Sequence, residues 1–303
     1  MIYTVTLNPS IDYIVKVDSL TMGAVNRIGA EFKYPGGKGI NVSRILKRLD
    51  LPTKATGFIG GFTGQFILDS LADEDVATQF VSVSTDSRIN IKLKSDEETE
   101  INGVGPTISD DQLKALESIL ANTTKEDIVV FAGSAPINLT NRIYQELIPI
   151  AKQNGAEVVC DFEGQTLVDS LQHQPLLVKP NHHELAAIYQ VELNSIEEIV
   201  SYGEKLLAQG AKHAIVSMAG EGALLITKDG NYFAKPIKCT VKNSVGAGDS
   251  MVAGFTGIMS KTGDALEAFK WGVACGSATA FSEDLADASY INQLYQQVEV
   301  EKI

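Results

Sequence analysis

Residues 128–160 read IVVFAGSAPINLTNRIYQELIPIAKQNGAEVVC, in which two short apolar runs flank a longer amphipathic stretch. The first run covers Ile128 to Ala132, the second covers Glu157 to Cys160, and residues 139–153 between them have helical spacing. Further apolar runs follow at 176–178 and 214–217. Because strands and helices alternate in this way, the sequence predicts βα units and a parallel sheet.

Two segments do not follow this alternation. Residues 11–34 and 88–105 lack a helical period, and Ile89 to Lys94 alternates between apolar and polar side chains. We expect both segments to contribute strands to a small β-sheet that projects from the main sheet. Such a sheet would cover the carboxyl ends of the parallel strands, where open α/β folds bind ligands. Two decorative hairpins are the alternative.

Composition excludes several classes of protein. The chain has 303 residues, of which 44% are hydrophobic, so we expect one large globular domain over residues 1–303. A formal net charge of −13 argues against nucleic-acid binding, which needs a basic face. The three cysteines are widely spaced, which is typical of reduced thiols in a cytosolic protein. The apolar residues 1–7 lack the basic flank of a signal peptide, and no apolar run is long enough to span a bilayer. We expect a cytoplasmic protein that binds no membrane.

The strongest motif is NSVGAGDS at residues 243–250, followed by a helical pattern at 251–261. Its small residues allow a tight turn into a helix, whose first N–H groups have no partner within the helix and favour negative charge. We expect the turn Gly246–Gly248 to form an anion hole, with the N–H groups of Ala247, Gly248 and Asp249 directed outward. Asp249 is then placed to accept a proton as a general base. An ordinary helix N-terminal cap is the alternative.

A second glycine-rich motif, PGGKGINV, occupies residues 35–42 and leads into a helical pattern at 43–49. Gly36 and Gly37 allow the backbone to approach a polyhydroxylated ligand closely, Asn41 can donate and accept hydrogen bonds, and Lys38 adds a positive charge. The spacing of a Walker phosphate loop is absent from the chain. A plain glycine-rich turn is the alternative.

Two further motifs could serve a nucleotide and a metal ion. Residues 217–223 form a small-residue turn between predicted strands, which could admit nucleotide phosphates or be a plain hairpin. Asn181 and Glu184 follow a buried strand and offer oxygen atoms suited to Mg²⁺, through water. His182 and His183 are poor ligands for that ion and are interpreted as solvated residues at a helix start.

With the motifs at 36–41 and 246–249 in this order, the chain resembles the pfkB group of ribokinase-like carbohydrate kinases along nearly its whole length. Within the group it is most similar to the 1-phosphofructokinase branch, through TLNPSIDY at 6–13, Lys38 and TEING at 99–103. The tagatose-6-phosphate kinase branch shares the first two features, and Ser10 leaves that branch open.

The resemblance implies a three-layer α/β/α sandwich with a mostly parallel sheet and a β-sheet lid that often pairs two subunits. It implies ATP and Mg²⁺ as cofactors, Asp249 as the base, and D-fructose 1-phosphate as the acceptor, converted to fructose 1,6-bisphosphate. The implied acceptor contacts are Asp12, Gly36, Gly37, Lys38, Asn41, Arg88, Asn90 and Ser134. The implied nucleotide contacts are Ser217, Met218, Ala219, Gly220, Glu221, Gly222 and Gly248, with Asn181 and Glu184 near the metal. A catalytically silent sensor of sugar phosphate or nucleotide is the alternative from another class.

Overall fold

The computed structural model describes residues 1–140 and 142–303, and its largest element is a ten-stranded sheet. The strand order is β14-β13-β12-β11-β10-β9-β8-β1-β4-β5. The strands from β5 to β11 in this order run parallel, and β12, β13 and β14 are antiparallel. The predicted, mostly parallel sheet is therefore confirmed. Its strands are β1 (Ile2–Thr6), β4 (Thr53–Gly60), β5 (Ala77–Val83), β8 (Ile128–Ala132), β9 (Glu157–Asp161), β10 (Leu177–Val178), β11 (Ala214–Ser217), β12 (Ala223–Thr227), β13 (Gly230–Ala234) and β14 (Val300–Lys302).

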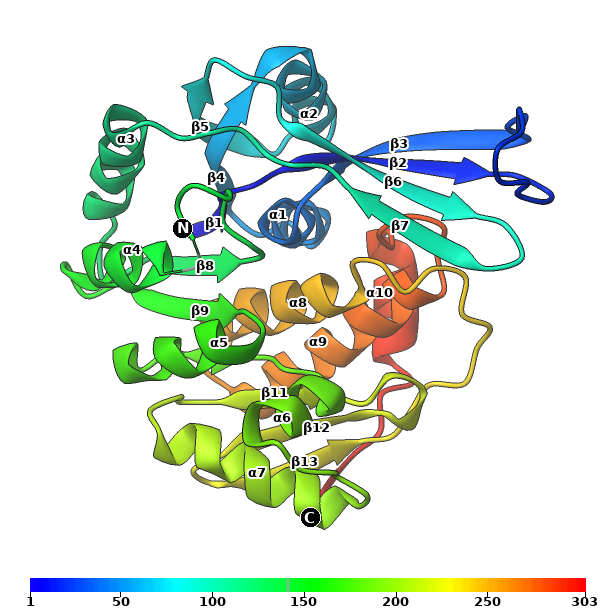
Figure 1. The fold of residues 1–303 in the computed structure, drawn as a ribbon. Coiled ribbons are helices and arrows are strands. Elements are labelled where there is room, and N and C mark those ends of the chain that lie inside the picture. Colours follow the sequence, from blue (N-terminus) through cyan, green and yellow to red (C-terminus); the bar gives the residue numbers. More distant parts are fainter. Residues whose placement is uncertain (141) are drawn as a thin grey trace.

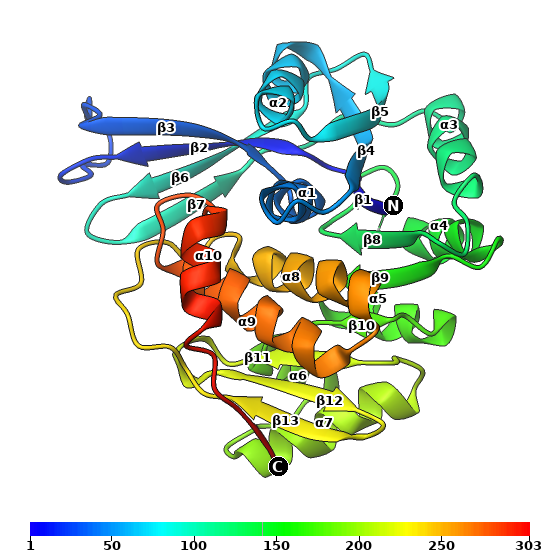
Figure 2. The same cartoon turned by 180° about the vertical axis from the view of Figure 1, so that it is seen from behind.

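Helices cover both faces of this sheet, which completes the three layers (Figures 1 and 2). The strand β8 shows why, because Val129 and Phe131 belong to one buried core while Ile128 and Val130 belong to the other. One face carries α1 (Lys38–Arg48), α8 (Ala247–Thr262), α9 (Ala265–Ala280) and α10 (Ala288–Tyr295). The other carries α3 (Asp110–Ala121), α4 (Ile143–Lys152), α5 (Gly164–Ser170), α6 (His182–Tyr189) and α7 (Ile196–Ala208), and α2 (Gly61–Asp73) packs on β4 and β5.

The helix boundaries differ from the predicted ones at two places that matter for the site. Helix α1 begins at Lys38 rather than at residue 43, so Lys38 and Asn41 lie in its first turns. Helix α8 likewise begins at Ala247 rather than at residue 251. In both cases glycines precede or open the helix, and packing of the helix against the sheet outweighs their low helical propensity.

The two segments outside the βα alternation form a separate four-stranded sheet, here called the lid. Its order is β3-β2-β6-β7, and it projects away from the main sheet (Figure 1). The lid strands are β2 (Ser10–Lys16), β3 (Ala30–Gly36), β6 (Arg88–Lys94) and β7 (Glu98–Asn102). The predicted small sheet is confirmed, although residues 17–29 between β2 and β3 contain no strand. Within the described residues, no helix is long and apolar enough to cross a membrane.

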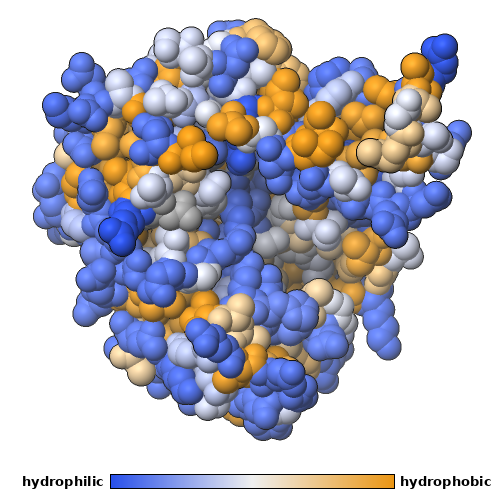
Figure 3. Space-filling view, viewed as in Figure 1, coloured by the Kyte–Doolittle hydropathy of each residue, from blue (hydrophilic) through white to orange (hydrophobic). Residues whose placement is uncertain are grey.

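The register of the lid strands places polar side chains on one face. Asp12 lies opposite Asn90 across the β2–β6 pair, and Lys92 lies opposite Glu100 across the β6–β7 pair. Because side chains alternate along a strand, Ile89 and Ile101 point to the other face. The side chain of Ile101 is exposed, and Figure 3 shows apolar patches over the lid. The lid therefore has a polar inner face and a partly apolar outer face.

Candidate active site

A cavity of about 680 Å³ lies between the lid and the carboxyl ends of the parallel strands. Thr6, Asp161 and Ser217, at the ends of β1, β9 and β11, line its floor, while side chains of β2, β6 and β7 line the lid side. The hollow opens on the face drawn in Figure 3. This is the position that open α/β sheets use for ligands.

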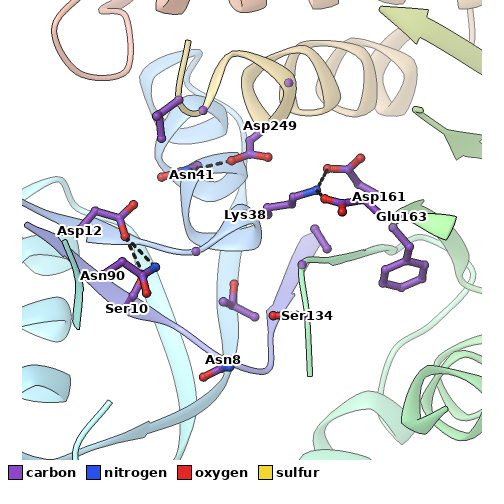
Figure 4. Close-up of a pocket in the computed structure, with 18 of the residues that line it drawn as sticks. Asn8, Ser10, Asp12, Lys38, Asn41, Asn90, Ser134, Asp161, Glu163 and Asp249 are labelled. Carbon is purple, nitrogen blue, oxygen red and sulfur yellow. Dashed lines mark hydrogen bonds and ion pairs between the residues drawn. The ribbon is translucent and has the colours of Figure 1, made fainter. Parts of the chain in front are cut away.

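Asp249 lies in the first turn of α8 and is 7% exposed. Its Oδ2 accepts a hydrogen bond of 2.8 Å from Nδ2 of Asn41 on α1 (Figure 4). Within residues 1–140 and 142–303, no side chain forms a capping hydrogen bond at the start of α8, so the alternative of an ordinary helix cap does not apply there. Burial raises the pKa of Asp249 to about 6, and Asp161 adds to the rise while Lys38 opposes it. A carboxylate with such a pKa can accept a proton near neutral pH.

Two lysines flank a second buried carboxylate at the end of β9. Oδ2 of Asp161 lies 3.6 Å from Nζ of Lys38, and its Oδ1 lies 3.5 Å from Nζ of Lys179. Burial alone would raise the pKa of Asp161, but Lys179 and Lys38 hold that pKa below its usual range. Asp161 in turn raises the pKa of Lys38, with help from Asp249 and against burial. Oε1 of the exposed Glu163 also lies 3.5 Å from Nζ of Lys38, so two ammonium groups and two carboxylates meet at this edge of the cavity.

The sequence motifs assign no role to Asp161 or Lys179, although Lys179 begins the stretch that contains Asn181 and Glu184. Both follow apolar runs that the sequence identified, at 157–160 and 176–178. In a parallel sheet, the residue after such a run lies at the ligand-binding edge. The signal that identifies Asp161 and Lys179 is therefore a charged residue directly after a predicted strand.

The anion hole at the head of α8 differs in composition from the predicted one. The N–H group of Ala247 donates to the carbonyl oxygen of Ser244 at 3.3 Å, so it does not point outward. Across residues 1–140 and 142–303, the N–H groups of Gly248 and Asp249 have no acceptor. A Cβ atom at Gly248 would lie 3.1 Å from Nζ of Lys179, so a glycine here lets that ammonium approach the helix end. The site thus combines two N–H groups with Lys179.

The lid contributes a polar network, drawn in Figure 4, and it also contributes Arg88 to the cavity lining. Oδ1 of Asp12 accepts hydrogen bonds from Ser10 at 2.8 Å and from Asn90 at 3.3 Å. Nε of Arg88 donates to the carbonyl oxygen of Asn8 at 3.1 Å, and burial lowers the pKa of Arg88. In the part of the chain that the structure describes, Arg88 has no ion-pair partner. Its positive charge is available to an anionic ligand.

The cavity contains most, but not all, of the predicted acceptor contacts. It is lined by Asp12, Gly37, Lys38, Asn41, Arg88, Asn90 and Ser134. Gly36 does not line it, but a Cβ atom there would overlap the carboxylate of Asp12, which Gly36 therefore accommodates. The sequence did not indicate Lys92 and Glu100, whose Nζ and Oε1 are 2.7 Å apart at the lid side of the cavity. Their pairing depends on the strand register, which local sequence does not reveal.

Of the predicted nucleotide contacts in the 217–222 turn, the cavity wall includes Ser217 alone. Met218 is buried, and its N–H group donates to the carbonyl oxygen of Gly222. The strands β11 and β12 pair in antiparallel fashion around this turn, as the sequence predicts. Residues 218–222 therefore lie beyond the cavity wall.

Asn181 and Glu184 both line the cavity, and they cap α6 reciprocally. Asn181 Oδ1 accepts from the N–H group of Glu184, and Glu184 Oε2 accepts from that of Asn181, each at 2.8 Å. Glu184 Oε1 takes no part in these bonds. No group of three or more His, Cys, Asp or Glu residues within the described chain could hold a metal directly. The pair therefore fits an ion that keeps its water ligands.

A buried carboxylate, two lysines and a helix N-terminus meet beneath a polar lid, an arrangement suited to a kinase that phosphorylates a hydroxyl of a small acceptor. Comparison with known proteins agrees. Residues 5–290 match the pattern of the pfkB family carbohydrate kinases. The chain belongs to that family.

Individual relatives match over the full length. The chain is 52% identical over 303 residues to a 1-phosphofructokinase of Bacillus subtilis, with all of both chains covered. It is 38% identical over 301 residues to a D-tagatose-1-phosphate kinase of Bacillus licheniformis, which covers 99% of each. Phosphofructokinase-2 of Escherichia coli, crystallised with substrates and products, superposes with a TM-score of 0.93 at 29% identity, covering 98% of each chain.

Proposed function

We propose that the protein transfers the γ-phosphoryl group of ATP to D-fructose 1-phosphate and releases fructose 1,6-bisphosphate and ADP. The observation that carries this proposal is the pairing, in one cavity, of a buried base, Asp249, with Arg88, which has no ion-pair partner among the described residues. A half-buried arginine without an ion pair suits an acceptor that already carries a phosphate. The relationship to the B. subtilis 1-phosphofructokinase supports the same acceptor.

The residues can divide the reaction as follows. Asp249 accepts the proton of the acceptor hydroxyl, whose oxygen forms a bond to the γ-phosphorus of ATP. The bond from that phosphorus to the β,γ-bridging oxygen breaks, and ADP leaves with the bonding electrons. Lys179 and the N–H groups of Gly248 and Asp249 offset the charge on the transferring group. Asn41 orients the base through its hydrogen bond.

We propose that Mg²⁺ binds near Asn181 and Glu184 through water. When bound, the ion would neutralise charge on the phosphates of ATP. The fit rests on Glu184, whose Oε1 lies outside the capping bonds and whose side chain lines the cavity. We place the reaction in the cytoplasm, where free thiols such as Cys160, Cys239 and Cys275 remain reduced.

A panel of acceptors tests the proposal. Purified protein is assayed with MgATP and with the 1-phosphates and 6-phosphates of fructose and tagatose, and kcat/KM is compared. Fructose 1-phosphate is expected to give the highest value. A higher value for a tagatose phosphate would favour the second candidate, for which the B. licheniformis relative argues. If none of the four sugar phosphates supports ATP turnover, the proposal is contradicted.

We further propose a homodimer that forms through the lid. The outward-facing Ile89 and Ile101 are 39% and 56% exposed, and a projecting sheet with such a face favours pairing with a second copy. Light scattering at micromolar concentration is expected to give twice the mass of one chain. Replacing Ile101 by Lys should shift the protein toward the monomer, whereas the same change at Ile137, exposed outside the lid, should not. A monomeric wild type would refute this assembly.

A further inference from the structure

A buried arginine and two half-buried acids connect α1 to the segment between α9 and α10. Arg44 on α1 has 3% of its side chain exposed. Its Nη1 and Nη2 donate to the two carboxylate oxygens of Asp284 at 3.2 and 2.5 Å, and its Nε donates to Glu74 at 2.7 Å. Glu74 lies at the C-terminal end of α2. This bidentate geometry fixes both partners, because a buried guanidinium without its acids would be costly.

The segment that carries Asp284 also supports the catalytic turn. A Cβ atom at Gly246 would lie 2.6 Å from Cδ2 of Leu285, so Leu285 packs directly against the turn. Nδ2 of Asn243 donates to the carbonyl oxygen of Glu283 at 3.2 Å. The residues on either side of Asp284 therefore contact the stretch that precedes Asp249.

Helix α1 reaches the same turn from another direction. Asn41, one helical turn before Arg44, donates to the carboxylate of Asp249. A side chain three residues further along a helix lies on the same side. Arg44 thus binds the segment that supports the turn, while Asn41 binds the base that the turn carries.

We propose that Arg44 and Asp284 are positioning residues that hold the Gly246–Asp249 turn in register with Asn41. Neither residue lines the large cavity, so neither touches the acceptor or ATP directly. Their contribution is to the placement of the base and of the Gly248 and Asp249 N–H groups. This inference rests on the proposed kinase function, in which those groups act on the transferring phosphoryl group.

Two matched variants test the proposal. Asp284→Asn weakens the link from Arg44 to the catalytic segment, whereas Glu74→Gln weakens the link from Arg44 to α2. Arg48 contacts both acids, so the loss of that contact is common to the two variants, and both acids are 26% exposed. Asp284→Asn is expected to lower kcat about tenfold, the scale of a sub-ångström misplacement, with little change in KM. Glu74→Gln should keep kcat within about twofold of the wild type. The Tm of both variants should fall by similar amounts.

Amide hydrogen exchange separates this inference from the proposed function. Exchange in residues 244–250 should accelerate in Asp284→Asn but not in Glu74→Gln, whichever acceptor the enzyme uses. Equal losses of kcat in the two variants, or unchanged exchange in Asp284→Asn, would overturn the positioning role. A wild type that fails to phosphorylate fructose 1-phosphate would refute the proposed acceptor and would leave the exchange comparison to decide the role of Asp284.

Discussion

Replacing Asp249 by Asn is expected to lower kcat by about 10²- to 10⁴-fold, the usual range for loss of a general base. Asparagine keeps the size of the side chain and an oxygen that can accept from Nδ2 of Asn41, as the carboxylate of Asp249 does at 2.8 Å in the wild type. It cannot take the proton of the acceptor hydroxyl. Nucleotide affinity, measured by calorimetry, should change much less, because Lys179 and the Gly248 N–H group remain.

Asp264→Asn provides the matched control. Asp264 is also an acid at a helix N-terminus, where it caps α9 by accepting from the N–H groups of Leu266 and Glu267. Asp264 does not line the cavity of about 680 Å³, so kcat of Asp264→Asn should stay at the wild-type value. If kcat of Asp249→Asn also stays within a few-fold of wild type, the proton leaves by another route and the proposed mechanism is wrong.

Replacing Lys38 by Met is expected to lower kcat/KM for the acceptor by about 10- to 100-fold, which corresponds to one lost contact of a charged group. Its ammonium lies 3.6 Å from Asp161 and 3.5 Å from Glu163, so methionine leaves more negative charge around the phosphates. Lys38 also opposes the rise in the pKa of Asp249. The variant should therefore need a higher pH to reach its maximal rate.

Lys212→Met is the control for this charge removal. Lys212 forms an ion pair with Glu157 and does not line the large cavity. Steady-state kinetics of both variants at several pH values make the comparison. Equal kcat/KM in the wild type and Lys38→Met would remove Lys38 from the site.

The parts of the fold that local sequence determines were predictable. One example is the start of α3, where Ser109 and Gln112 have the spacing of a capping box and both of its reciprocal bonds are present. The βα alternation around residues 128–160 gave the parallel sheet for the same reason: each strand buries both faces, and each helix buries one.

Features that depend on distant parts of the chain were not predictable. Asp249 stood out because its glycine-rich turn is a local signal, but the pairing of Asp161 with Lys179 arises only when β9 and β10 lie side by side. The Arg44–Asp284 pair joins residues 240 positions apart. The prediction that the N–H group of Ala247 points outward was wrong. This group donates to Ser244, in a turn that depends on the left-handed backbone at Gly246.

The pH dependence of kcat/KM decides whether Asp249 accepts the proton of the acceptor hydroxyl. With a pKa of about 6, Asp249 is ionised above that pH and loses its function as the pH falls through 6. The phosphate of the acceptor also titrates near pH 6, so the residual activity of Asp249→Asn must be measured in parallel. We expect the wild type to lose activity more steeply toward low pH than Asp249→Asn does. Superimposable profiles, differing only in height, would contradict the assignment of Asp249 as the base.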